Sequence, residues 1–150
     1  MKREYFYDPA TGGACCILTH KGLKFSGTAT CHKDDMDFAS ERTGLFIAEG
    51  RAILRLLKHQ KQELEPGIIA LQHAVNCIRD SKDFNPKAKE YQIVYKLLYD
   101  KKRERDILNV RIASEKQYLA DYIKNKDLIY KSLRRRRNQD KTIEYNLIEI

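Results

Sequence analysis

The chain of 150 residues has the length of one domain and carries a formal net charge of +8, from 29 Lys and Arg against 21 Asp and Glu. Such a surface attracts anions, among them nucleic acids, nucleotides and acidic lipids, but the charge does not choose between them. A cytoplasmic protein is expected, because the four cysteines are irregularly spaced and the sequence shows neither a secretory signal nor an apolar run of the roughly 20 residues that cross a bilayer.

Alternating apolar and polar residues predict a small antiparallel sheet near the N-terminus. The segment "HKG" provides a turn between the apolar residues 14–19 and a second strand, which Gly27 interrupts. Two strands alone are only marginally stable, so we expect "REYFY" to add a third strand and a helix to cover the sheet. The apolar residues of the second strand recur at a period of two: Leu23, Phe25, Ala29 and Cys31.

Three helices are expected to follow the sheet. Apolar spacings of three and four predict one helix that ends before Pro66 and a second, shorter one through residues 68–78. Neither Pro nor Gly occurs from Ala88 to about Arg134, which predicts a single helix of about 45 residues and about 70 Å. The predicted fold is therefore α+β, in one domain with a sheet region (1–36), a helical region (37–135) and a peripheral tail (136–150).

The long helix carries two seven-residue repeats on one face, a pattern typical of helix pairing. One small chain is too short to cover such a rod, so we expect it to pair with a second copy in a homo-oligomer. The repeats are Val94, Lys101, Leu108, Glu115, Tyr122 and Ile129, and Leu98, Arg105, Ile112, Leu119, Lys126 and Leu133.

Two cations interrupt this apolar seam. Burying Lys101 and Arg105 costs free energy unless anions meet them. A bound phosphate would supply the anions. Two alternatives remain open: the seam opens to water there, or acidic side chains satisfy the cations, the candidates being Glu104, Asp106 and Glu115.

The stretch "CHKDDMDFASE" concentrates a thiol, an imidazole and several carboxylates. Cys31 and His32 diverge on an extended segment and have no second Cys or His pair at ligand spacing, which argues against zinc. The aspartates lack the calcium-loop pattern, so we interpret them as caps of the first helix that help to fix the sheet against it. Motifs for a nucleophile or a hydrolytic metal are also missing, so we expect no enzyme, no metal and no cofactor.

Two further features leave alternatives open. Gly12 and Gly13 form either a plain turn or a pair of consecutive amides that face an anion. The four arginines of residues 134–137 suit a solvated tail, a nucleic-acid contact or the cation-rich end of a helix.

Several segments together resemble the phage Thoeris anti-defence sponge proteins of the first type. They are "YFYDPATGGACC", "GTATCHKDDMDFASERTG", "IAEGRA", "KDFNPK" and the Arg-bearing long helix, in this order over nearly the whole chain. The resemblance implies a dimer, or a hexamer of three dimers, in the cytoplasm of a host bacterium during phage infection. It also implies that the chain binds a cyclic ADP-ribose immune signal without cleaving it, and that a separate site for cyclic oligonucleotides exists in some members.

The chemistry of such a ligand suggests which residues hold it. Two phosphates, an adenine and two riboses need cations, an aromatic ring and short polar groups. We expect backbone amides of Gly13 and Ala14 to floor the pocket. The other expected ligand-binding residues are Lys101, Arg105 and Arg111 for the phosphates, Phe84 for the adenine, and Asn85, Asp106 and Asn109 for the riboses.

Two other functions compete with this one. A nucleic-acid-binding phage protein would use the basic long helix, and its affinity would fall steeply with salt. A helical adaptor for another protein, with no membrane partner, would leave the basic residues solvated and bind no nucleotide.

Overall fold

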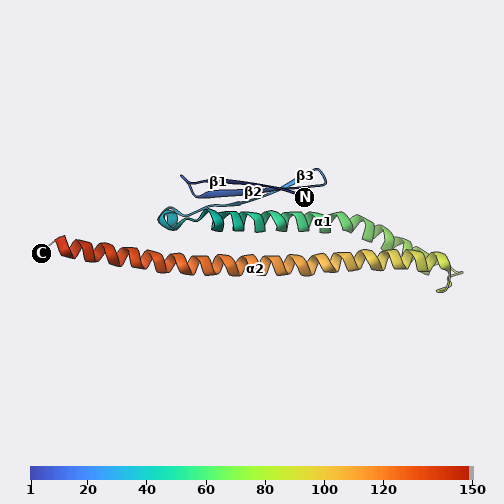
Figure 1. Cartoon of the computed structure of the whole chain (residues 1–150). Coiled ribbons are helices and arrows are strands. Elements are labelled where there is room, and N and C mark those ends of the chain that lie inside the picture. Colours follow the sequence, from blue (N-terminus) through green and yellow to red (C-terminus); the bar gives the residue numbers. More distant parts are fainter. Residues whose placement is uncertain (149–150) are drawn as a thin grey trace. The chain divides into compact units, whose positions relative to one another are not determined.

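The computed structural model describes the backbone of residues 1–148 and the side chains of residues 1–140. It has an α+β architecture, with a three-stranded sheet followed by two long helices (Figure 1). The chain divides into two compact units: unit 1 joins Met1–Arg55 to the residues from Glu115 onward, and unit 2 is Leu56–Ser114. The elements are β1 (Lys2–Asp8), β2 (Gly13–His20), β3 (Leu23–Ala29), the 3₁₀ helix η1 (Lys33–Phe38), α1 (Glu41–Arg79) and α2 (Lys89–Ile148).

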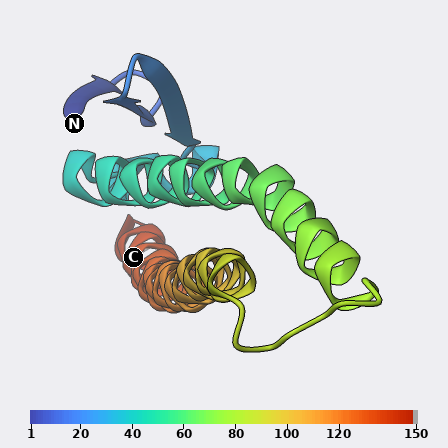
Figure 2. The ribbon, with the colours of Figure 1, turned by 90° about the vertical axis from the view of Figure 1, so that its right-hand side faces the viewer.

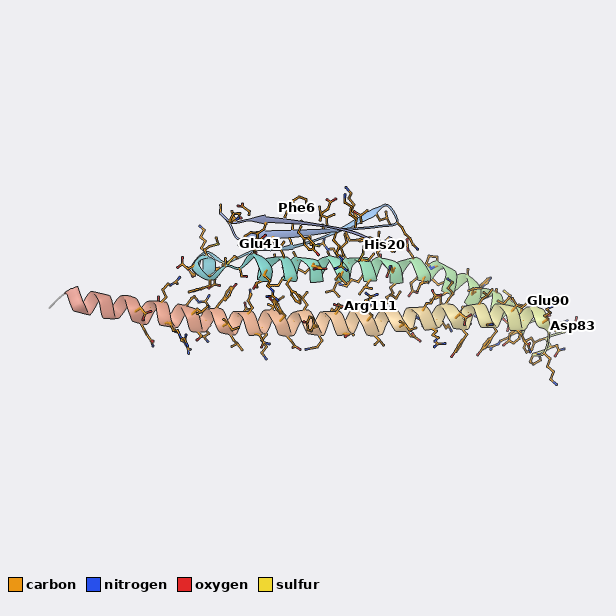
Figure 3. The ribbon with its side chains drawn as sticks, viewed as in Figure 1. Phe6, His20, Glu41, Asp83, Glu90 and Arg111 are labelled. Carbon is orange, nitrogen blue, oxygen red and sulfur yellow. The ribbon has the colours of Figure 1, made fainter. Side chains whose placement is uncertain are left out.

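The sheet confirms the three strands predicted from the alternating pattern. Its order is β1-β2-β3, with both pairs antiparallel. Lys21 and Gly22 have φ angles of 51° and 77°, which a tight two-residue hairpin requires. Cys16 and Leu18 of β2 are completely buried on the face toward α1, whereas Phe6 of β1 lies on the outer face (Figure 3).

The sheet packs closely on α1 because both surfaces are made of small residues. Gly27 of β3 lies directly over Ala48 and Ala52, both fully buried, and the Cβ atom of Ala14 lies against Gly44 of α1. A thin helix face of this kind lets the backbone of a strand approach, and Figure 1 shows the strands lying along the first turns of α1. The glycine that interrupts the alternating pattern of β3 is therefore a packing position.

The prediction of two shorter helices separated at Pro66 is wrong, because α1 is one continuous helix through that residue (Figure 2). A proline inside a helix removes one backbone hydrogen bond at a cost of about 3 kcal/mol. Packing offsets this cost: Leu64 precedes the proline, and Ile68 and Val75 follow it, in one apolar cluster of unit 2 that also contains Leu98 of α2.

The long helix is longer than predicted, since α2 continues to Ile148 instead of giving way to a tail at residue 136. Part of its apolar seam is covered by α1 of the same chain. Leu98 packs on α1 in unit 2, and Leu119 lies against Gly50 of α1 in unit 1. The seven-residue repeat therefore reports helix pairing within each unit, and a homo-oligomer stays a prediction.

Candidate functional site

The acidic stretch forms a 3₁₀ helix that two arginines of α2 tie down within unit 1. Arg134 Nη1 donates to Asp35 Oδ1, and Asp35 is only 8% exposed. Arg137 Nη1 donates to the Asp34 carbonyl oxygen and to Asp37 Oδ2, both at 3.0 Å. We call these contacts the arginine clamp. Two of the four arginines of the basic run thus hold η1 in place.

The aspartates do not cap α1 as predicted. The backbone amide of Thr43 donates to Ser40 Oγ at 3.4 Å, and the amide of Gly44 donates to the Ser40 carbonyl oxygen at 3.0 Å. Ser40 is thus the capping residue, and the carboxylates of Asp35 and Asp37 face the arginine clamp instead. The acidic stretch therefore has a structural role through its ion pairs with α2 rather than through capping of α1.

A cavity of about 690 Å³ lies beside η1 in unit 1. One wall is formed by the end of β3 and by η1, a second by the first turns of α1, and a third by α2 around Tyr130. This volume is within the range of small-molecule sites, roughly 300–1,000 Å³. The polar side chains of the lining include Thr30, Lys33, Asp34, Ser40, Thr43, Lys126, Asp127 and Tyr130.

Burial raises the pKa values of two side chains that line this cavity. The pKa of Tyr130 is raised, first by burial and then by the neighbouring Cys31 and Asp35. The pKa of the Cys31 thiol is raised by burial and by Asp35, although Lys126 acts in the opposite direction. At neutral pH the phenol therefore remains a hydrogen-bond donor, and Cys31 lacks the thiolate that a nucleophile or metal ligand needs.

The β1–β2 turn already satisfies the amides that were considered for anion binding. The Gly12 amide donates to the Asp8 carbonyl oxygen at 2.8 Å, and the Gly13 amide donates to Thr11 Oγ1 at 3.3 Å. Gly12 has a φ of 69°, which explains why a glycine stands there. The plain-turn interpretation accounts for both glycines, and Ala14 is buried in unit 1 with 5% exposure.

The predicted adenine and ribose residues Phe84 and Asn85 line a smaller hollow, of about 390 Å³, in unit 2. The ring of Phe84 meets Tyr91 edge-on at 5.0 Å between centroids, and Arg79 Nε donates to the Tyr91 hydroxyl at 2.9 Å. The Asn85 side-chain oxygen accepts the Lys87 amide at 3.0 Å. Asp83 and Glu90 also line this hollow at the α1–α2 connection (Figure 3), so it combines aromatic rings with acidic groups.

The predicted cations lie further along α2 in unit 2. Lys101 pairs with Glu104 at 3.8 Å and Arg105 with Asp106 at 3.6 Å, so acidic neighbours on the same helix meet both seam cations. Arg111 is exposed, as is Asn109. About 24 Å of helix separates the start of α2 from Arg105, at a rise of about 1.5 Å per residue.

The predicted site residues do not form one pocket within a unit. Gly13 and Ala14 belong to unit 1, whereas the other seven belong to unit 2 and divide between the hollow at Phe84 and the cationic stretch of α2. Their role as ligand contacts stays a prediction.

The acidic stretch that the sequence singles out supplies one wall of the larger cavity, but the α2 residues of its lining were not predicted. Lys126 occupies a seam position of the long helix, like Lys101 and Arg105, and the same interruption of an apolar repeat would have marked it. Tyr130 and the pairing of Arg134 with Asp35 gave no comparable signal, because the paired residues are 99 positions apart.

Through residue 140, side chains show no group of three or more His, Cys, Asp or Glu residues placed to hold a metal ion. Neither of the two long helices, as far as the structure describes them, has the length of apolar sequence that a bilayer span requires. Comparison with protein-family models, curated proteins and solved structures found no match to this chain.

Proposed function

We propose that this chain binds and sequesters a cyclic ADP-ribose signal without cleaving it, as its resemblance to the Thoeris sponge proteins implies. The observation that carries the proposal is the exposed surface of α2 around Arg111. Ile107, which is 58% exposed, lies four positions before Arg111 on the same helix face, and Val110, which is 72% exposed, lies three positions after Ile107. Cations and uncovered apolar groups side by side suit a ligand with phosphates and a base.

The second copy of the chain is part of this proposal. The long helix leaves a series of large apolar side chains uncovered by its own chain, and a stable soluble chain seldom leaves so many on one element. A second copy that covers them would also bring another set of pocket elements to the cations. The second set is needed because, within one chain, Phe84 and Arg105 lie further apart along α2 than a cyclic ADP-ribose can span. The uncovered residues include Ile93, Leu97, Ile107, Val110, Tyr118 and Leu128.

The larger cavity of unit 1 is a poorer place for the phosphates. Lys33 and Lys126 are its lysines, but Asp34 and Asp127 line the same space, and Lys126 already pairs with Asp127 at 3.0 Å. Carboxylates beside the lysines repel a second anion. Arg111, which is exposed on α2, is the better candidate for a phosphate contact.

The rival nucleic-acid function loses part of its basis. Arg134 and Arg137 are engaged with the carboxylates of η1, so only two arginines of the run, Arg135 and Arg136, remain exposed. Only half of the run can therefore contact the phosphates of a nucleic acid, because the other half belongs to the arginine clamp.

Sequestration predicts that the ligand is returned unchanged. The protein is incubated with a panel of cyclic ADP-ribose isomers, desalted and heat-denatured, and the released molecules are identified by mass spectrometry. We expect one intact cyclic isomer in stoichiometric amount. Release of linear ADP-ribose would show turnover instead, and release of no nucleotide would favour the adaptor function.

Removing a cation of α2 should weaken this binding. A charge-assisted hydrogen bond contributes roughly 1.5–3 kcal/mol, so Arg105→Ala or Arg111→Ala should lower the affinity by about ten- to a hundredfold in calorimetry. Arg135→Ala, an exposed arginine of the same helix, is the matched control and should leave the affinity unchanged. Equal losses in all three variants would indicate nonspecific attraction by net charge.

Light scattering tests the second copy. We expect the wild-type chain to be at least dimeric at micromolar concentration, and Ile107→Asp with Val110→Asp to split it while circular dichroism stays helical, because both side chains are exposed. Leu108 and Ile112 are unsuitable for this test, since both are at least partly buried within their own chain. Ile69→Asp, at an exposed position of α1, is the control. A monomeric wild-type chain would contradict the assembly.

A further inference from the structure

The cavity of unit 1 differs from the cationic stretch of α2 in its balance of charge. Its lysines, Lys33 and Lys126, are matched by Asp34 and Asp127, and the third carboxylate, Asp35, is taken by Arg134 of the arginine clamp. The lining therefore has no surplus cation for a phosphate and no surplus carboxylate for a metal ion. A ligand without net charge suits it best.

The uncharged polar side chains of the same lining are mostly hydroxyls. Thr30, Ser40 and Thr43 each present one, and Tyr130 adds a phenol from α2. A hydroxyl donates one hydrogen bond and accepts two, whereas a carboxylate only accepts. Asp127 pairs with Lys126 through Oδ1, but its side chain is 64% exposed, so Oδ2 can accept from the hydroxyl groups of a ligand, and the threonines offer both roles.

We infer that this cavity is a second binding site, separate from the α2 cations, for an uncharged small molecule with neighbouring hydroxyl groups. A carboxylate can accept from two adjacent hydroxyls, and the lining also includes the apolar Ala29 and Ile47, which can contact a ring. Ribose in a nucleoside and a free sugar share this chemistry. The site differs from the proposed phosphate contacts in its residues and in the charge of its ligand, which is neutral rather than anionic.

The test compares four molecules on the full-length protein by calorimetry: adenosine, 2′-deoxyadenosine, adenosine 5′-monophosphate and D-ribose. We expect adenosine to bind at least tenfold tighter than the deoxy compound, which lacks the diol, and tenfold tighter than the monophosphate, which brings a charge. If ribose binds as tightly as adenosine, the ligand is a sugar; if it binds more weakly, the ligand is a nucleoside.

Two variants locate the binding. Asp127→Asn and Tyr130→Phe should each weaken adenosine by about tenfold, the range for losing a hydrogen bond to a charged or buried partner. Asp100→Asn, at an exposed position of α2 in unit 2, is the matched control for Asp127→Asn, and Tyr99→Phe, at an exposed position of the same helix, is the control for Tyr130→Phe; both should leave adenosine binding unchanged. Tighter binding of the monophosphate, equal binding of the deoxy compound, or no binding of adenosine or ribose at millimolar concentration would overturn the inference.

Discussion

Gly27→Ala is expected to destabilise the protein by about 3 kcal/mol, at the upper end of the range for an overpacked core. A methyl group at Gly27 would overlap the Ala48 carbonyl oxygen and stand 2.5 Å from the Ala52 nitrogen. Both are backbone atoms of α1 and have no rotamer by which to move away. The added methyl group therefore pushes the whole sheet off the helix.

Urea unfolding at a fixed protein concentration measures this effect, with Gly67→Ala as the matched control. Gly67 lies inside α1, and among the described residues no atom stands within 4 Å of the methyl group that the change adds. Replacing an exposed helical glycine by alanine should stabilise the protein by up to about 1 kcal/mol. Equal unfolding midpoints for Gly27→Ala and the wild-type chain would show that the sheet does not rest on α1 in this way.

Breaking the arginine clamp is expected to have the second largest effect. Arg134→Ala leaves the Asp35 carboxylate in a position with 8% exposure and without its cation. Removing one partner of a fully buried pair costs about 3–5 kcal/mol, but the Arg134 side chain is 35% exposed, so we expect about 2 kcal/mol. Chemical unfolding followed by circular dichroism measures the loss, and Arg135→Ala should change it by less than about 0.5 kcal/mol.

A double-mutant cycle separates the ion pair from the packing of the arginine stem. On an Asp35→Asn background the buried charge is gone, so Arg134→Ala should cost much less than it does in the wild-type chain. Additive effects of the two substitutions would contradict the clamp, because two residues that interact directly cannot be independent.

Local sequence patterns predicted the presence and type of each helix and strand better than the residues at which it begins and ends. The alternation of Leu23, Phe25 and Ala29 identified β3, and the three-and-four spacing identified both parts of α1. Pro66 predicts a helix end because the rule for proline is local, whereas the packing of Ile68 and Val75 on Leu98 is not. The local penalty of a few kcal/mol is small compared with the free energy gained by an apolar cluster whose members lie on both sides of the proline.

The candidate site was predicted in part, by residue type rather than by position. Seam cations were recognised as unusual, and their acidic neighbours on α2 were named as one alternative, which the structure shows. Lys126 follows the same rule but was read as an ordinary seam position. No sequence pattern marked Tyr130, because the cavity it lines joins the α2 residues 126–130 to residues that lie about 80 or more positions earlier in the sequence.

The sequence by itself determined the elements with a regular period: three strands, three helical stretches, of which the first two form α1, and the apolar face of each. These follow from side-chain spacing, which depends only on the local backbone. The tertiary structure alone decided which surface covers each face. The repeat on α2 marks a buried stripe, but only the fold shows that α1 of the same chain covers Leu98 and Leu119. It likewise decided that Arg134 meets Asp35, because a charge attracts any opposite charge and the chain path selects the partner.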